Sequence, residues 1–230
     1  MSRLPRLAIG GHVHLVLQRA LQPLFKDDDD RELLLRQLAA AARTENVAIH
    51  AYALLDQEIL LLVTPPEAVA LSRLMQGLGR SYVAGFNRRH GRSGTLWQGR
   101  FRATVVDADA FLIPCMCYVE SRSAALGYPP MEYRWSSAWH HLGQTRSAFI
   151  VEHPSFWRLG NTPFDREATY RSVLERGLPP SEARAIEAAA QKGWALGGEA
   201  FLLNLEGQTE RPIRPRARGR PRNTERRTEN

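Results

Sequence analysis

The chain has 230 residues, 43% of them hydrophobic, which is enough to bury a core, and no apolar run approaches the roughly 18 residues that a membrane-spanning helix needs. The N-terminus lacks the basic region, apolar stretch and small-residue cleavage site of a secretory signal, so we expect a cytoplasmic protein with no membrane partner. The formal net charge of +7 favours nucleic acid as a partner instead.

Apolar runs predict the first elements of the fold. Residues 12–17 (HVHLVL) are expected to form a strand, and the four aspartates at 27–30 to cap a helix whose apolar residues fall at helical spacing. Because their spacing matches no calcium loop, we assign these aspartates to the positive end of the helix rather than to a metal site. Residues 47–55 and 58–64 are expected to form two strands joined by a tight turn.

The next elements complete a repeating pattern. A second helix is expected from about 71 to 89, then a loop, a fourth strand at 100–107 and a helix capped by Asp109, which Pro114 must kink or shorten. The order βαββαβ, followed by a helix, predicts an α+β protein of the ferredoxin-like class. Such a domain, over residues 1–127, is an open antiparallel sheet with helices on one face.

Beyond residue 128 the composition changes. Residues 128–206 begin with a segment rich in proline and aromatic residues and continue with short helical patterns, so we expect a helical C-terminal extension packed on the core. Residues 207–230 hold eight arginines and three glutamates, a charge of about +5, and are expected to be a disordered basic tail. Since arginine's planar fork suits phosphate and base edges, this tail is either a DNA-binding arm or only a solvated end.

Eight stretches spread along the chain carry a family resemblance: HLVLQRA, DDDDRELLLRQL, VAIHAYALL, the segment from Leu71 to Asp107, YRWSSAWHH, LGNTPF, GWALG and RGRPR. They resemble the REP-associated tyrosine transposases, a bacterial branch of the single-tyrosine HUH transposases, over nearly the whole chain. The resemblance implies a protein that recognises hairpin-forming single-stranded DNA. Enzymes of this kind cut the strand by attack of a tyrosine hydroxyl on a phosphate, and the reverse step rejoins it.

In that family a divalent ion, held by two histidines that flank an apolar residue on the third strand, orients the scissile phosphate. Where the family typically has Asn-His-Val-His, this chain has Gln57-Glu58-Ile59-Leu60, so the resemblance implies a degenerate HUH motif. Glu58 still offers an oxygen to Mg²⁺ or Mn²⁺, the expected cofactors if the chain is active. His14, on the neighbouring first strand, is the second candidate metal ligand.

Tyr118 is the candidate nucleophile. In CMCYVESRSAALG, Tyr118 and Glu120 keep a family pattern whose later Asn-Pro and Arg positions hold Arg122, Ser123 and Ala125 here. The alternative role of Tyr118 is structural, with its ring packed on the sheet and its hydroxyl hydrogen-bonded. Two altered motifs in one site favour a DNA-binding protein with impaired or lost cleavage. An active transposase that forms a Tyr118 phosphotyrosine with an altered metal site is the alternative, and a decaying gene product with a sound fold is a third interpretation.

Cations and aromatic rings gather around the loop that follows the second helix, a combination that binds single strands through phosphate contacts and base stacking. The candidate DNA-binding residues there are Arg88, Arg89, Arg92, Trp97, Arg100 and Arg102. In the tail, an RGRPR sequence resembles an AT-hook, which lies along an A·T minor groove, and it contributes Arg218, Arg220 and Arg222. The expected partners are therefore hairpin single strands and, through the tail, duplex DNA, and a homodimer is compatible with these features.

Overall fold

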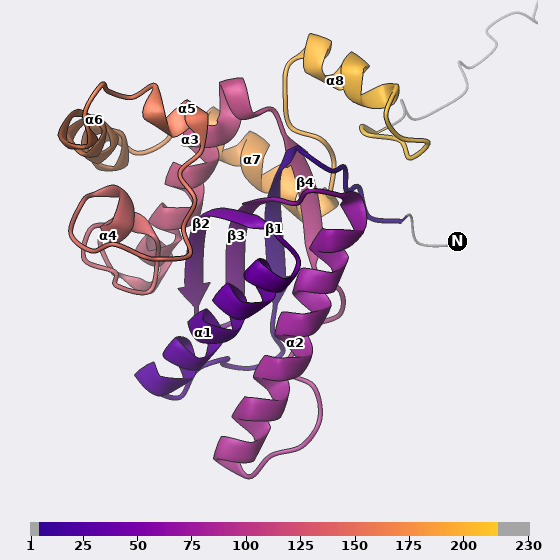
Figure 1. The fold of residues 1–230 in the computed structure, drawn as a ribbon, viewed down its shortest axis with the longest axis vertical. Coiled ribbons are helices and arrows are strands. Elements are labelled where there is room, and N and C mark those ends of the chain that lie inside the picture. Colours follow the sequence, from indigo (N-terminus) through magenta and orange to yellow (C-terminus); the bar gives the residue numbers. More distant parts are fainter. Residues whose placement is uncertain (1–4, 216–230) are drawn as a thin grey trace, which may run out of the picture.

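The computed structural model describes residues 5–215 of the chain (Figure 1). Its centre is an antiparallel sheet in the order β2-β3-β1-β4, formed by β1 (Val13–Arg19), β2 (Ala48–Leu55), β3 (Glu58–Thr64) and β4 (Arg102–Val106). Two long helices make the crossings, α1 (Asp28–Thr44) between β1 and β2 and α2 (Ala68–His90) between β3 and β4. The predicted α+β class with an antiparallel sheet is confirmed.

The acidic run before the first helix caps it, as predicted. Asp27 is the N-cap residue, and its side chain accepts a hydrogen bond of 3.1 Å from the backbone N–H of Asp30. The three aspartates that follow Asp27 lie in the first helical turn, where negative charge stabilises the positive end of the helix. These residues therefore define where α1 begins.

Both faces of the sheet are covered by helices, whereas the sequence predicted helices on one face only. Residues paired across adjacent strands share a face, and Gln18 and Ile59 lie on the face covered by α2. Thr104 lies on the opposite face, where its hydroxyl donates a 2.9 Å hydrogen bond to the Ala189 carbonyl of α7 (Pro180–Lys192). There α3 (Ala108–Glu120) packs against β2 and β3 (Figure 1). The sequence prediction assigned α3 and the C-terminal extension to no particular face of the sheet, and the structure places them on the second one.

The helix after β4 differs in two details from the sequence prediction. Its N-cap is Asp107, whose carboxylate accepts from the backbone N–H of Asp109 at 3.3 Å, so Asp109 lies in the first turn instead. The helix also continues through Pro114 to Glu120. The continuation carries Tyr118 onto the second face of the sheet.

The C-terminal part of the chain shares its core with the sheet. It consists of a 3₁₀ turn, η1 (Ser121–Leu126), and five helices, α4 (Ala138–His141), α5 (Pro154–Trp157), α6 (Pro163–Arg176), α7 and α8 (Glu199–Glu206). Phe156, Tyr170 and Ile186 are buried in the same apolar cluster as the strands. The predicted domains 1–127 and 128–206 are therefore packed around one core.

The basic tail was predicted to begin at residue 207, but the residues up to 215 are folded. Ile213 is 1% exposed and packs with Leu7, Ile9 and Val105, and its carbonyl accepts a 2.9 Å hydrogen bond from the Ala195 N–H. Residues 207–215 thus belong to the folded body. The AT-hook-like candidates Arg218, Arg220 and Arg222 lie outside the described residues.

A buried carboxylate joins α3 to this C-terminal part. Glu120 is fully buried, and its two oxygens accept hydrogen bonds from the Ser137 hydroxyl and, at 2.7 Å, from the Tyr170 hydroxyl. His141 Nδ1 lies 2.7 Å from one of the same oxygens. Because every partner is itself buried, Glu120 has a structural role that fixes the end of the helix bearing Tyr118.

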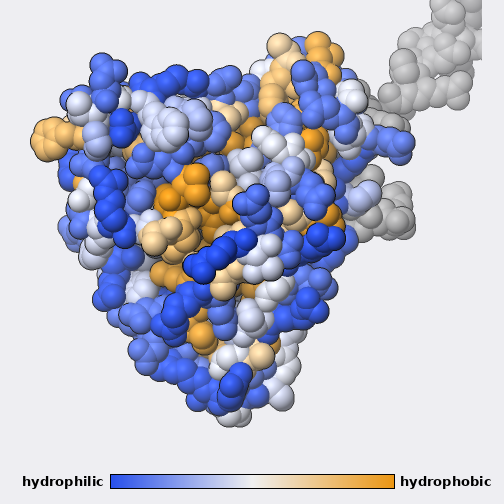
Figure 2. Space-filling view, in the orientation of Figure 1, coloured by the Kyte–Doolittle hydropathy of each residue, from blue (hydrophilic) through white to orange (hydrophobic). Residues whose placement is uncertain are grey.

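The surface over α1 and α2 has apolar side chains in its middle and hydrophilic ones around them (Figure 2). Across residues 5–215, no helix combines the length and apolar character that crossing a bilayer requires.

Candidate nucleic-acid interface

The first residue of β3, Glu58, binds two arginines. Its Oε2 lies 3.1 Å from Arg19 Nε and its Oε1 lies 3.2 Å from Arg122 Nη2, so each carboxylate oxygen accepts from a guanidinium group. The side chain of Glu58 is 13% exposed. Leu60, two residues further, points to the same face and is buried. Leu60, for which the sequence resemblance implied a histidine, is therefore part of the apolar core.

Tyr118 lies beside this ion-pair cluster on α3. It is half-buried, and the guanidinium of Arg122 sits 5.5 Å from the centre of its ring. Burial raises the pKa of the Tyr118 hydroxyl, and the positive charge of Arg122 opposes that rise only in part. The structure thus brings Tyr118 and Glu58 together, as predicted, with Arg122 next to both.

His14 is on the other face of the sheet. It pairs with Val63, five residues along β3 from Glu58, while Arg19 is the partner of Glu58. Its Nε2 accepts a 3.2 Å hydrogen bond from the Ile9 N–H, and its Nδ1 lies 2.8 Å from a backbone carbonyl. Burial lowers the pKa of His14 to about 4, so the ring is neutral. The expectation that His14 joins Glu58 at a metal was wrong, because alternate residues of a strand face opposite ways.

The donor set around Glu58 does not fit a divalent ion. Mg²⁺ and Mn²⁺ prefer several oxygen ligands, whereas one carboxylate, already bound by two cations, is present here. Over the part of the chain that the structure describes, no group of three or more His, Cys, Asp or Glu side chains could hold a metal ion.

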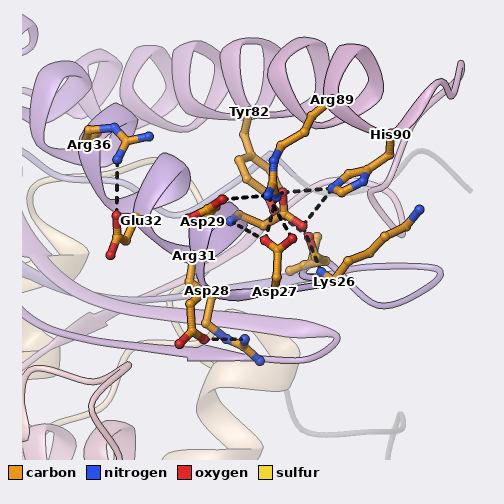
Figure 3. Close-up of polar contacts among 12 residues, drawn as sticks. Lys26, Asp27, Asp28, Asp29, Arg31, Glu32, Arg36, Tyr82, Arg89 and His90 are labelled. Atoms are coloured by element: carbon orange, nitrogen blue, oxygen red, sulfur yellow. Dashed lines mark hydrogen bonds and ion pairs between the residues drawn. The ribbon is translucent and has the colours of Figure 1, made fainter.

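Arg89 belongs to a structural ion-pair cluster rather than to a DNA-binding surface (Figure 3). Its guanidinium lies 2.6 Å from a carboxylate oxygen of Asp30 and 2.7 Å from Asp29, and it also pairs with Asp27. His90 Nε2 is 2.9 Å from Asp30 as well. The hydrogen bonds from Arg89 lower the pKa of Asp27. This predicted DNA contact instead ties the end of α2 to the start of α1.

Of three other candidates, Arg88 and Arg92 lie at the same end of α2, and Trp97 packs against its middle. Trp97 is half-buried, donates from Nε1 to the Gly79 carbonyl at 3.4 Å, and lines a cavity of about 530 Å³ with residues of α2. The guanidinium of Arg92 lies 5.7 Å from the ring of Phe86, and Arg88 is exposed. Since the lining of that cavity includes Ile59, it opens on the face away from Glu58.

Arg100 and Arg102 lie on the Tyr118 side of the sheet. Both are exposed, and with Leu17 and Arg19 they line a hollow of about 320 Å³ at the start of β4. Arg102 also donates to the carbonyl of Gln191 in α7. The predicted arginine set is thus divided, and Arg100 and Arg102 share a hollow with Arg19, the partner of Glu58.

Sequence reasoning missed Arg19 and Arg122 as members of this site. Arg122 follows Tyr118 by four residues, a spacing that puts two side chains on one side of a helix. Arg19 is two residues after Leu17 on β1 and shares its face. These two spacings could have indicated in the sequence that Arg122 lies beside Tyr118 and that Arg19 faces the same side of the sheet as Leu17.

No protein-family model matches the chain, and no curated protein sequence matches it. Among solved structures, a REP-associated tyrosine transposase bound to a REP hairpin superposes with a TM-score of 0.53 at 14% sequence identity, over 67% of this chain and 93% of that one. A Deinococcus radiodurans protein assigned as a transposase superposes with a TM-score of 0.35 at 17% identity, over 46% of this chain and 87% of that one. The first likeness establishes a similar fold.

Proposed function

We propose that this chain is a DNA-binding protein of the REP-associated tyrosine transposase type, which holds hairpin-forming single-stranded DNA without metal-dependent cleavage. The observation that carries the proposal is the Arg19–Glu58–Arg122 ion-pair cluster beside Tyr118. It puts two guanidinium groups where the family resemblance implies a divalent ion.

Four arginines on one face favour contact with phosphate. Arg19 and Arg122 are 41% and 29% exposed, and the exposed side chains of Arg100 and Arg102 extend the positive surface. A guanidinium donates two parallel hydrogen bonds to a phosphate and keeps its charge at any physiological pH. The hairpin bound by the structurally similar transposase supports DNA as the ligand here.

The state of Tyr118 favours binding over cleavage. Attack on a phosphate requires the hydroxyl to lose its proton, and burial raises its pKa. In the family chemistry the metal ion compensates by drawing charge from the phosphate, but Leu60 is apolar and Glu58 is neutralised by Arg19 and Arg122. The segment after Tyr118 also departs from the family pattern, because Arg122, Ser123 and Ala125 stand at its Asn-Pro and Arg positions.

One observation favours the alternative of an active enzyme. Arg122 is close enough to Tyr118 to offset part of the rise in its pKa and to bind a phosphate next to the hydroxyl. In that case a bond forms between the Tyr118 oxygen and phosphorus as the bond from phosphorus to the leaving strand breaks, and the leaving oxygen takes up a proton.

Binding to a labelled hairpin strand, measured by fluorescence anisotropy, tests the proposed interface. Arg100→Ala and Arg102→Ala should each weaken the affinity about fivefold, since removing one hydrogen-bonded phosphate partner costs on the order of 1 kcal/mol. Tyr118→Phe removes no charge and should leave the affinity unchanged. Arg36→Ala, on the exposed side of α1, is the matched control for the removal of one positive charge. Equal affinities for all four variants would contradict the proposed interface.

Restoring the family histidines tests the account of lost cleavage. The double variant Glu58→His with Leu60→His should form a covalent protein-DNA complex in Mn²⁺, seen as a shifted band on a denaturing gel. The band should disappear when Tyr118→Phe is added. A double variant that binds the hairpin but remains inert would assign the loss to the segment after Tyr118 as well.

A further inference from the structure

A second cationic cavity lies next to the proposed interface. It has a volume of about 300 Å³ and lies where three parts of the chain meet, the N-terminal segment, the start of β4 and the end of α7. None of the described residues that line it is acidic. Five of them are basic, namely Arg6, Arg100, Arg102, Lys192 and Arg211. A concave site of one charge sign concentrates ions of the opposite sign.

Arg211 has hydrogen-bonding capacity left over inside this cavity. Its Nη2 donates to the Gly193 carbonyl at 2.9 Å, but Nε and Nη1 are buried and have no hydrogen-bond partner among residues 5–215. Burial lowers the pKa of Arg211. Arg211 itself is half-buried, but buried donor atoms without a partner are costly, and a bound anion is the kind of group that satisfies them.

The surroundings of Arg211 resemble a nucleic-acid contact. Its guanidinium lies 5.6 Å from the ring centre of Trp194, which also lines the cavity. Lys192 is exposed and has no acidic partner in the described part of the chain. Cations interleaved with an aromatic ring are the usual means of binding a single strand without reading its sequence.

The cavity shares two lining residues with the hollow next to Arg19. Arg100 and Arg102 line both, and Arg19 lines the hollow. Arg100 and Arg102 thus stand between Arg19 in the hollow and Arg211 in the cavity, so basic side chains line both sites.

We propose that this cavity binds a backbone phosphate of the single strand that extends from the hairpin, with Arg211 and Lys192 as its ligands. This inference rests on the proposed function, and it adds a second phosphate position, at the end of α7. Through this cavity the protein binds the strand next to the hairpin, and this binding does not depend on the altered metal site.

Matched charge substitutions in the full chain test this assignment. Lys192→Gln and Arg211→Gln are compared with Lys26→Gln and Arg36→Gln, which remove the same charges from exposed positions around α1. The probes are a hairpin with a single-stranded extension, the same hairpin without it, and inorganic phosphate. Affinity is measured over a salt series, and circular dichroism checks that each variant is folded.

We expect Lys192→Gln and Arg211→Gln each to weaken binding of the extended hairpin about tenfold and to lower its log-log salt slope by about 0.7, the value for one single-strand phosphate. The control variants and the blunt hairpin should show neither effect. Should the blunt hairpin lose as much affinity as the extended one, or the slopes match those of the controls, the cavity does not hold the extension.

Two further outcomes separate this inference from the proposed function. Stabilisation of the fold by inorganic phosphate that depends on Arg211, combined with unchanged DNA binding, would make the cavity a site for a free anion and overturn the DNA assignment. A wild-type chain that binds neither hairpin would overturn the proposed function together with this inference.

Discussion

Replacing Glu58 by Gln should weaken the fold slightly and strengthen DNA binding. The carboxylate, 13% exposed, lies 3.1 Å from Arg19 and 3.2 Å from Arg122. Because the two arginine side chains are 41% and 29% exposed, we assign each pair about 0.5 kcal/mol, the middle of the range for solvent-accessible ion pairs. The variant should lose about 1 kcal/mol of unfolding free energy, which lowers Tm by roughly 2–4 °C in a chain of this size.

The same substitution releases both guanidinium groups from their internal partner. If one of them then binds a phosphate, the log-log salt slope of binding rises by about 0.7, and Kd for the hairpin falls about fivefold at low salt. Thermal denaturation followed by circular dichroism measures the first effect, and anisotropy of a labelled hairpin across a salt series measures the second. Glu32→Gln is the matched control, since it removes the same charge from an exposed pair with Arg36 on α1.

Glu58→Gln should thus lower the stability of the fold and raise the affinity for the hairpin, and a general loss of structure cannot produce both effects. If Glu58→Gln binds the hairpin no better than Glu32→Gln does, Arg19 and Arg122 do not contact phosphate.

Three more predictions concern parts of the chain outside this cluster. Arg89→Ala should lower Tm clearly more than Arg88→Ala, because Arg89 pairs with the buried Asp30 and Arg88 is exposed, and equal Tm values for the two variants would refute the structural role of Arg89. The pKa of His14 is lowered to about 4 against 6.5 in the unfolded chain, so its contribution to stability is complete above about pH 6.5 and is lost as pH falls toward 4. Urea titrations should show a flatter loss of stability over that pH range in His14→Gln, and an unchanged pH dependence would contradict the assignment. Deleting the arginine-rich residues 216–230 should reduce the salt slope of DNA binding by about 0.7 for each single-strand phosphate that they neutralise, and an identical slope would exclude them from the interface.

The sheet and its two crossing helices could be predicted because they depend on local patterns. The mostly apolar run at 58–64 and the four aspartates at the start of α1 specify structure through residues close to them in the chain, and both predicted elements are present in the structure. The covering of the second face could not be predicted in the same way. It depends on contacts such as that of Thr104 with Ala189, which are 85 residues apart in the chain.

The candidate site was predicted only in part, because its contacts also join residues that are distant in the chain. Tyr118 and Glu58 came from a resemblance, and both lie next to Arg122 on the second face of the sheet. Arg89 was misassigned because its partner Asp30 is 59 residues away, and a basic side chain at a helix end looks the same in sequence whether it binds DNA or an aspartate. His14 was misassigned because its face depends on the register of β1 against β3.

The central claim is that arginines, not a metal ion, hold the DNA beside Tyr118. Its most direct test is the affinity of the wild-type chain for a hairpin single strand in Mn²⁺ and in excess EDTA, with each sample then run on a denaturing gel. We predict the same Kd under both conditions and no covalent protein-DNA band. A Kd that rises on chelation, or a Mn²⁺-dependent band that disappears in Tyr118→Phe, would contradict the claim.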